Sequence, residues 1–197
     1  MIAYLKGKLA LKDPTHLIVD VNGIGYQVNI SLNTFSEIKD QENVFIHTYL
    51  HVKEDSHTLF GFTQESEKRM FLSLLSISGV GPNTALMVQS SLSAAELKQA
   101  IVNEDVKTIQ SVKGVGGKTA QRIILELKDK IKKEGLFEEA DKNSGGGYNT
   151  LKNEALSALT TLGINKSAAE KSIDSILKSS GNTITLEELI KLSLKNA

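Results

Sequence analysis

Two glycine-containing segments of the sequence have the residue types that could bind a phosphate group. Residues 77–85 read ISGVGPNTA and residues 112–120 read VKGVGGKTA, so one frame of apolar residue, Gly-Val-Gly turn and Thr-Ala pair occurs twice. Glycine permits positive φ and leaves no side chain between the main chain and a ligand. The N–H groups that open the following helix favour an anion, because they lack intrahelical partners and the helix dipole adds positive charge.

The repeat predicts two helix-hairpin-helix units, in which each turn binds a nucleic-acid phosphate. Lys118 and Arg122 are four residues apart and share one helix face, from which both could reach a phosphate. Two helix C-caps followed by ordinary helices are the alternative, but repetition of the whole frame favours DNA binding. The predicted DNA-binding residues are Gly79, Val80, Gly81, Asn83, Thr84, Lys113, Gly114, Val115, Gly116, Lys118, Thr119 and Arg122.

Two other glycine-rich motifs are absent from these segments. A Walker A loop ending at Lys118 would need glycine at position 112, which is valine. A dinucleotide-binding fingerprint would need glycine at position 84 or 119, and both are threonine. The sequence therefore predicts no nucleotide cofactor and no ATPase activity of its own.

Composition narrows the class of protein further. The 197 residues include no cysteine, which excludes thiolate metal sites and cysteine nucleophiles, and they contain no apolar run long enough to span a bilayer. His47 and His51 share a strand face but have no evident third ligand, so we expect no metal. Without a signal segment in residues 1–11, we expect a soluble, cytoplasmic protein.

Charge is unevenly distributed although the net charge is zero. Residues 64–135, which include both turns, carry 11 Lys and Arg residues against 8 Asp and Glu residues. Residues 1–63 carry 5 against 7, and residues 136–197 carry 7 against 8. The positive surplus therefore lies with the predicted phosphate-binding turns, where salt-sensitive contacts with DNA are expected.

The periodicity of apolar residues predicts an α+β protein of several domains. Short β-branched and aromatic segments with turn signals, including Asn22-Gly23, predict an OB-type β-barrel over residues 1–63. Helical spacing follows over 64–135, the predicted tandem helix-hairpin-helix domain. Residues 136–150, with a Gly-Gly-Gly run, predict a flexible linker, and residues 151–197 predict a three-helix module suited to binding a protein partner.

Two capping boxes are also predicted in these helical parts. Ser93 with Glu96 opens a helix in the first, and Thr185 with Glu188 opens one in the second.

In this order the segments resemble the RuvA family, the Holliday-junction-binding subunits of the bacterial branch-migration complex. The resemblance covers the whole chain and is carried by short motifs in each segment. These motifs are Met1-Ile2-x-x-Leu5-x-Gly7, Gly23-x-Gly25-Tyr26, His51-Val52-x-Glu54-Asp55, Leu59-Phe60-Gly61-Phe62, the two glycine turns, and Ala158-Leu159-x-x-Leu162-Gly163.

The resemblance implies a homotetramer that holds a four-way junction open and binds its phosphates without reading bases. On DNA, two such tetramers could form an octamer. Glu54 and Asp55 would project from a barrel hairpin as an acidic pin that keeps strands apart. A UBA-like C-terminal domain would contact the hexameric ATPase RuvB, with Leu159, Leu162, Ile164, Ile173 and Leu177 as candidate contact or core residues. A junction resolvase is a possible further partner. Asn83 departs from the lysine usual in this family.

Two alternatives stay open at the level of sequence. The first is a helix-hairpin-helix DNA glycosylase or lyase that uses Lys118 as a nucleophile, with Asp129 as the nearest candidate aspartate. The second is a scaffold that binds duplex DNA during repair, which differs only in DNA shape and oligomeric state.

Overall fold

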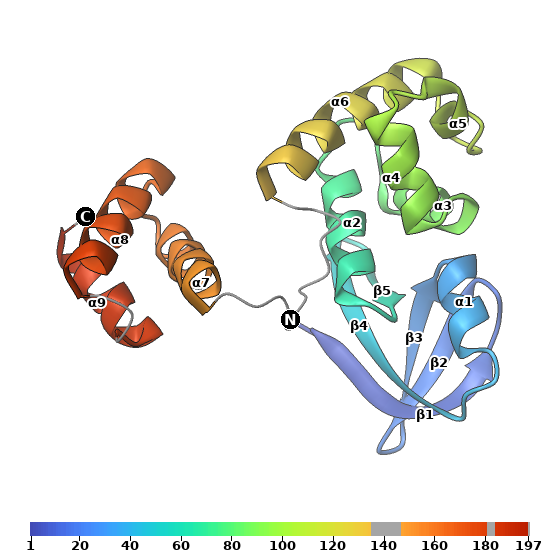
Figure 1. The fold of residues 1–197 in the computed structure, drawn as a ribbon. Helices are drawn as coiled ribbons and strands as arrows, with labels where there is room; N and C mark the ends of the chain where they lie inside the picture. The colour runs from blue at the N-terminus through green and yellow to red at the C-terminus, as the bar shows by residue number, and fades with distance from the viewer. Residues whose placement is uncertain (135–146, 181–183, 197) are drawn as a thin grey trace. The chain divides into compact units, whose positions relative to one another are not determined.

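The computed structural model describes residues 1–134, 147–180 and 184–196, and divides the chain into two compact units, Met1–Ala140 and Asp141–Ala197 (Figure 1). Most of the predicted linker, residues 136–150, lies outside the described residues. Its last four residues are the start of helix α7 (Gly147–Thr161), so the prediction of a linker there was wrong. A packed helix extends outward easily, because each added residue gains a backbone hydrogen bond.

The first unit begins with a closed five-stranded barrel in the order β1-β2-β3-β5-β4. The strands are β1 (Tyr4–Lys12), β2 (His16–Val21), β3 (Ile24–Ile30), β4 (Asn43–Val52) and β5 (His57–Phe62). All neighbours are antiparallel except β3 and β5, which pair in parallel. Alternate residues point inward and form a core that includes Leu17, Val19 and Ile46. The predicted OB-type barrel is confirmed.

The Asn22-Gly23 hairpin joins β2 to β3 as the sequence predicted. Asn22 and Gly23 have φ of +53° and +88°, the two positive values that a type I′ turn requires. The Asp20 carboxylate accepts a hydrogen bond of 2.8 Å from the Gly23 N–H. The turn therefore fixes the β2–β3 register.

The sequence reading expected only strands before residue 63, but a short helix, α1 (Leu32–Ile38), separates β3 from β4. Ser31 caps it by accepting from the Thr34 N–H, and Ile38 is buried in the barrel core. This helix was missed because its seven residues are too few to establish a helical period.

The helical spacing predicted over residues 64–135 is confirmed, and five helices form this part in the described residues of the first unit. They are α2 (Glu65–Leu75), α3 (Pro82–Ser91), α4 (Ala94–Val102), α5 (Val106–Gln110) and α6 (Gly117–Glu134). The predicted capping box that opens α4 is present, with Ser93 and Glu96 bonded to each other's backbone. Pro82 occupies the first turn of α3, where no amide donor is needed.

The barrel and the helices share one interior. Phe60 and Phe62 of β5 belong to the core of the helical part, and both rings lie about 5 Å from Phe71 of α2. Asn33 of α1 also donates to the Gln89 carbonyl at the end of α3, at 2.7 Å. Residues 1–134 therefore form one packed body rather than two independent ones.

A polar cluster also bridges the barrel to α2. The Thr63 hydroxyl lies 2.5 Å from the Glu37 carboxylate and 2.9 Å from that of Glu67. Burial raises the pKa of Glu67, although bonds from the Gln64 and Thr63 backbone and from the Thr63 hydroxyl act against that rise.

The second unit contains α7, α8 (Lys166–Ser180) and α9 (Leu186–Asn196). The predicted capping box at Thr185 and Glu188 opens α9. Alanine and aliphatic side chains from all three helices meet in a small core, as the three-helix prediction required. In the described parts of the chain, no helix combines the length and the apolarity needed to cross a membrane.

Candidate nucleic-acid interface

The two glycine turns have the same backbone geometry. Gly79 and Gly114 have φ of +91° and +88°, in the region that favours glycine. In both turns the following valine N–H donates to the apolar residue three positions earlier: Val80 to Ile77 and Val115 to Val112, each at 3.0 Å. The sequence repeat is therefore a structural repeat.

The second glycine of each turn has a different role from the first. Gly81 has φ of −88°, which any residue adopts, so its backbone conformation does not require glycine. A Cβ built on Gly81 or Gly116 would meet no atom within 4 Å. These positions leave the main chain open to an approaching group.

Val80 and Val115 were predicted to bind DNA, and the structure argues against direct contact. Each side chain is only 6% exposed, within the core shared with α2 and α6. Each amide N–H is already bonded within its turn. These valines anchor the turns, and Ala85 and Ala120, both fully buried, anchor the helices that follow.

The amides available to an anion lie one step further along each segment. The first intrahelical bonds run from Ala85 N–H to the Gly81 carbonyl and from Ala120 N–H to the Gly116 carbonyl, both at 2.9 Å. The N–H groups before these bonds, at residues 83–84 and 117–119, have no partner within their helices. The positive end of each helix dipole lies at the same place, so each turn can bind one phosphate.

The two turns lie close together. Arg122 of α6 donates a hydrogen bond of 3.0 Å from Nη1 to the Ser78 carbonyl in the first turn. A Cβ on Gly79 would lie 3.8 Å from the Thr119 hydroxyl at the start of α6. Arg122, predicted as a phosphate ligand, therefore also braces one turn against the other. The guanidinium has five N–H donors, of which this bond uses one.

Cations are concentrated on the second turn. Lys113 and Lys118 are exposed there, whereas Ser78 and Asn83 occupy the matching positions of the first turn. Further along α6, Lys128 pairs with Glu104, and Lys130 donates to the Ser76 hydroxyl at 2.6 Å. Lys113 and Lys118 therefore put two exposed cations at the second turn, whereas the first turn has none at the matching positions.

The acidic pair predicted as a pin lies at the tip of the β4–β5 hairpin. The tip is closed by a 2.8 Å bond from the Lys53 N–H to the Ser56 carbonyl. Glu54 and Asp55 are both exposed between these two residues. Two adjacent exposed carboxylates repel phosphate, so the tip can keep a strand away but is unsuited to binding one.

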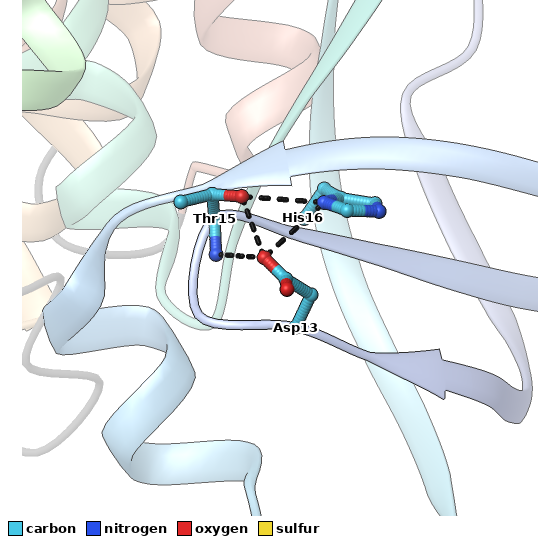
Figure 2. A network of polar contacts seen from close by, with 3 residues as sticks. All are labelled: Asp13, Thr15 and His16. Carbon is cyan, nitrogen blue, oxygen red and sulfur yellow. Dashed lines mark hydrogen bonds and ion pairs between the residues drawn. The ribbon is translucent and has the colours of Figure 1, made fainter.

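A second polar cluster, Asp13, Thr15 and His16, has residue types found in nucleophilic sites (Figure 2). Thr15 Oγ1 and Asp13 Oδ1 both approach the same His16 nitrogen, Nδ1, at 3.2 and 3.3 Å. A relay needs the hydroxyl and the acid on opposite ring nitrogens. The cluster instead closes the β1–β2 turn, and the Thr15 hydroxyl, the largest cause, holds the pKa of Asp13 below its usual value.

The arrangement on α6 also bears on the lyase alternative. Lys118 and Asp129 lie on the same helix, about 16 Å apart along its axis. They cannot act on one bond, so the structure removes the geometric basis for that alternative. In the part of the chain that the structure describes, no three His, Asp or Glu residues gather where a metal ion could bind.

The candidate contact residues of the C-terminal module divide into two groups. Leu159, Ile173 and Leu177 are buried, so these three form its core and cannot meet a partner directly. Ile164 is partly buried against that core, and Leu162 is 62% exposed after α7. Leu192 and Leu194 of α9, which the sequence reading did not single out, are also exposed.

Family models match the chain in three consecutive segments. Residues 1–61 match the RuvA N terminal domain, residues 71–129 a SAM-like helix-hairpin-helix tandem, and residues 150–197 the RuvA C-terminal domain. A protein of Cytophaga hutchinsonii is 61% identical over 197 residues, covering 99% of both chains. The chain belongs to the RuvA family.

Other relatives confirm that the RuvA match runs from end to end. A protein of Christiangramia forsetii is 52% identical and one of Acetivibrio thermocellus 42% identical, with 99% of this chain covered in each case. Both, like the Cytophaga protein, are named Holliday junction branch migration complex subunit RuvA. The barrel, the paired turns and the three-helix module are therefore the parts of a RuvA chain.

Proposed function

We propose that this protein is a non-catalytic DNA-binding subunit that holds four-way junctions and recruits a RuvB-type ATPase for branch migration. One observation supports this most strongly. Two glycine turns, each opening a helix whose first amides have no intrahelical partner, lie side by side in the same packed body as an exposed acidic hairpin tip. The turns would bind backbone phosphates whatever the base sequence, whereas the acidic tip would repel them. This combination suits a four-way junction, in which the strands separate at a central crossing point.

The site residues follow from this reading. Main-chain amides at residues 83–84 and 117–119, with Lys113, Lys118 and Arg122, would hold the phosphates of a DNA arm. Glu54 and Asp55 would stand at the crossing point. A homotetramer would present four copies of each, one per arm. Because bacterial DNA lies in the cytoplasm, we infer that a subunit acting on junction DNA would work there.

The three-helix module would bind the motor. Its exposed leucines, Leu162, Leu192 and Leu194, present apolar area that the small core does not use. Removing residues 150–197 should leave junction binding unchanged and abolish stimulation of a RuvB ATPase. Weakened junction binding by the truncated protein would contradict this division of roles.

Junction specificity is tested by comparing a four-way junction with linear duplex of the same length at one salt concentration. We expect much tighter binding of the junction, and a native mass that corresponds to four chains. Equal affinity for the two DNA shapes would refute the proposal in favour of a duplex-binding scaffold.

A further inference from the structure

The first hairpin lacks every cation of the second. When the two copies are aligned by their Gly-Val-Gly turns, each cation of the second copy matches an uncharged residue in the first. The pairs are Lys113 with Ser78, Lys118 with Asn83, and Arg122 with Met87. The backbone of the first turn is nevertheless built to the same geometry. The first turn has therefore kept the amides of a phosphate site but has uncharged residues where the second has cations, and one of them, Met87, is apolar.

This altered surface lines a groove. The groove has a volume of about 420 Å³ and lies between α3 and the barrel, with Asn83, Leu86 and Met87 on one wall and Ile30 and Leu32 on the other. Met87 is 41% exposed and Leu32 is 49% exposed. Exposed apolar side chains gathered around a groove are typical of a protein-binding surface.

Two exposed aromatic side chains on the barrel, Tyr4 and Phe45, form a surface that we call the Tyr4–Phe45 ridge, beside a hollow lined by Lys6 and Val44. Tyr4 of β1 and Phe45 of β4 are 56% and 47% exposed, and their rings stack with centroids 5.0 Å apart. Lys6 lies directly opposite Phe45 in the β1–β4 ladder, so their Cβ atoms are about 5 Å apart. In Figure 1, β1 begins on the left of the barrel, whereas α1 lies on its right, below α3.

We propose that a second copy of this chain docks its Tyr4–Phe45 ridge in this groove, and that its Lys6 thereby supplies the first glycine turn with the missing cation. The contact joins two different faces, so it is head to tail, and a rotation of about 90° between neighbours would close a ring of four chains. The inference rests on the proposed homotetramer and adds the faces that form it and a phosphate ligand contributed by the neighbouring subunit.

Charge favours a second copy over DNA as the occupant. The groove ends at Pro14 and Thr15, next to the Asp13 carboxylate. The Thr15 hydroxyl lowers the pKa of Asp13, so this group is ionised at neutral pH and repels phosphate. The ridge strand carries Lys6 and Lys8, whose charge complements Asp13.

Cysteine pairing tests the contact directly, since the native chain has no cysteine. The double variant Phe45→Cys/Met87→Cys, treated with a short bis-maleimide, should give a ladder of covalent dimers, trimers and tetramers on a denaturing gel. Each single variant alone should remain monomeric on that gel, because a head-to-tail contact never brings two copies of one position together. A covalent dimer from Phe45→Cys alone would overturn the proposal.

The matched control keeps Met87→Cys and moves the other cysteine to Ile24, an exposed barrel residue at the opposite end of β3 from the groove residue Ile30. Ile24→Cys/Met87→Cys should give no ladder. An equal ladder from both pairs would mean random collision and would also overturn the proposal.

Lys6→Gln tests the contributed cation in the assembled protein. If each subunit's Lys6 binds one phosphate, the slope of log affinity against log salt should fall by about 0.9 per bound Lys6. The exposed Lys171 of α8 provides a control, since Lys171→Gln removes the same charge outside the first unit. An unchanged slope for Lys6→Gln would refute the role of Lys6 in binding a DNA phosphate.

The outcomes separate this inference from the proposed function. A protein that prefers four-way junctions and has the mass of four chains, yet gives no ladder from Phe45→Cys/Met87→Cys, would refute the docking of ridge and groove alone. Loss of junction preference in the unchanged protein would refute the proposed function instead.

Discussion

Replacing each glycine of the second turn by alanine should separate stability from DNA binding. Gly114 has φ of +88°, where alanine costs about 1–2 kcal/mol. A loss of this size lowers the melting temperature by roughly 5 °C in a unit of this length. Gly116 is the residue before α6, and alanine there costs only about 0.5 kcal/mol, because it caps a helix less well than glycine.

The two substitutions should affect DNA binding in the opposite order, with the larger loss for Gly116→Ala. A methyl group at Gly116 would occupy the open space through which a phosphate reaches the amides of Gly117 and Lys118. A hydrogen bond to a charged group contributes about 1.5–3 kcal/mol, so losing one such contact weakens binding roughly ten- to hundredfold. Under conditions in which both variants are folded, Gly114→Ala should therefore bind the junction more tightly than Gly116→Ala.

Urea unfolding and fluorescence anisotropy with a labelled four-way junction measure the two quantities. Gly23→Ala is the matched control, because Gly23 has the same φ of +88° in the β2–β3 hairpin, away from both turns. It should lose stability as Gly114→Ala does and bind normally. Unchanged affinity in Gly116→Ala would refute the phosphate site, and equal stability losses at Gly114 and Gly116 would refute the conformational distinction.

Three further outcomes are expected. Glu54→Gln with Asp55→Asn should keep or raise junction affinity while changing branch migration by the complete complex, and clearly weaker binding would contradict a repulsive tip. Leu159→Ala should destabilise the C-terminal module by about 2–5 kcal/mol, seen in its own unfolding transition, without affecting junction binding. Bonds from the Thr108 hydroxyl and N–H lower the pKa of Asp105 from 3.8, so its stabilisation is present above pH 3.8 and lost as pH falls further. Acid titration of Asp105→Asn should therefore show a shallower loss of unfolding free energy than the unchanged protein; parallel curves would contradict this.

Local chemistry explains which elements could be predicted from sequence. Asn22-Gly23 and the Ser93–Glu96 capping box are short motifs whose structure depends on adjacent residues, and both form as expected. The parallel pairing of β3 with β5 depends on residues far apart in the chain, and no local pattern contains it. The shared core of Phe60, Phe62 and Phe71 was missed for the same reason.

The candidate site shows the same limit. The repeat identified both turns, but it could not show that the amides of Val80 and Val115 are bonded within them. Nor could one sequence show that Arg122 reaches the Ser78 carbonyl. Aligning the copies beyond their glycines would have revealed one further signal, the match of Met87 with Arg122.

The aromatic core between barrel and helices has a mechanical consequence. Phe60 and Phe62 belong to the strand that returns from the acidic tip, and both rings contact Phe71 in the helix that leads to the first glycine turn. Pulling on a DNA arm held at the turns would therefore load the barrel hairpin through close-packed rings that deform little. Torque delivered to the arms by a motor would reach the crossing point without being absorbed by a hinge within this unit.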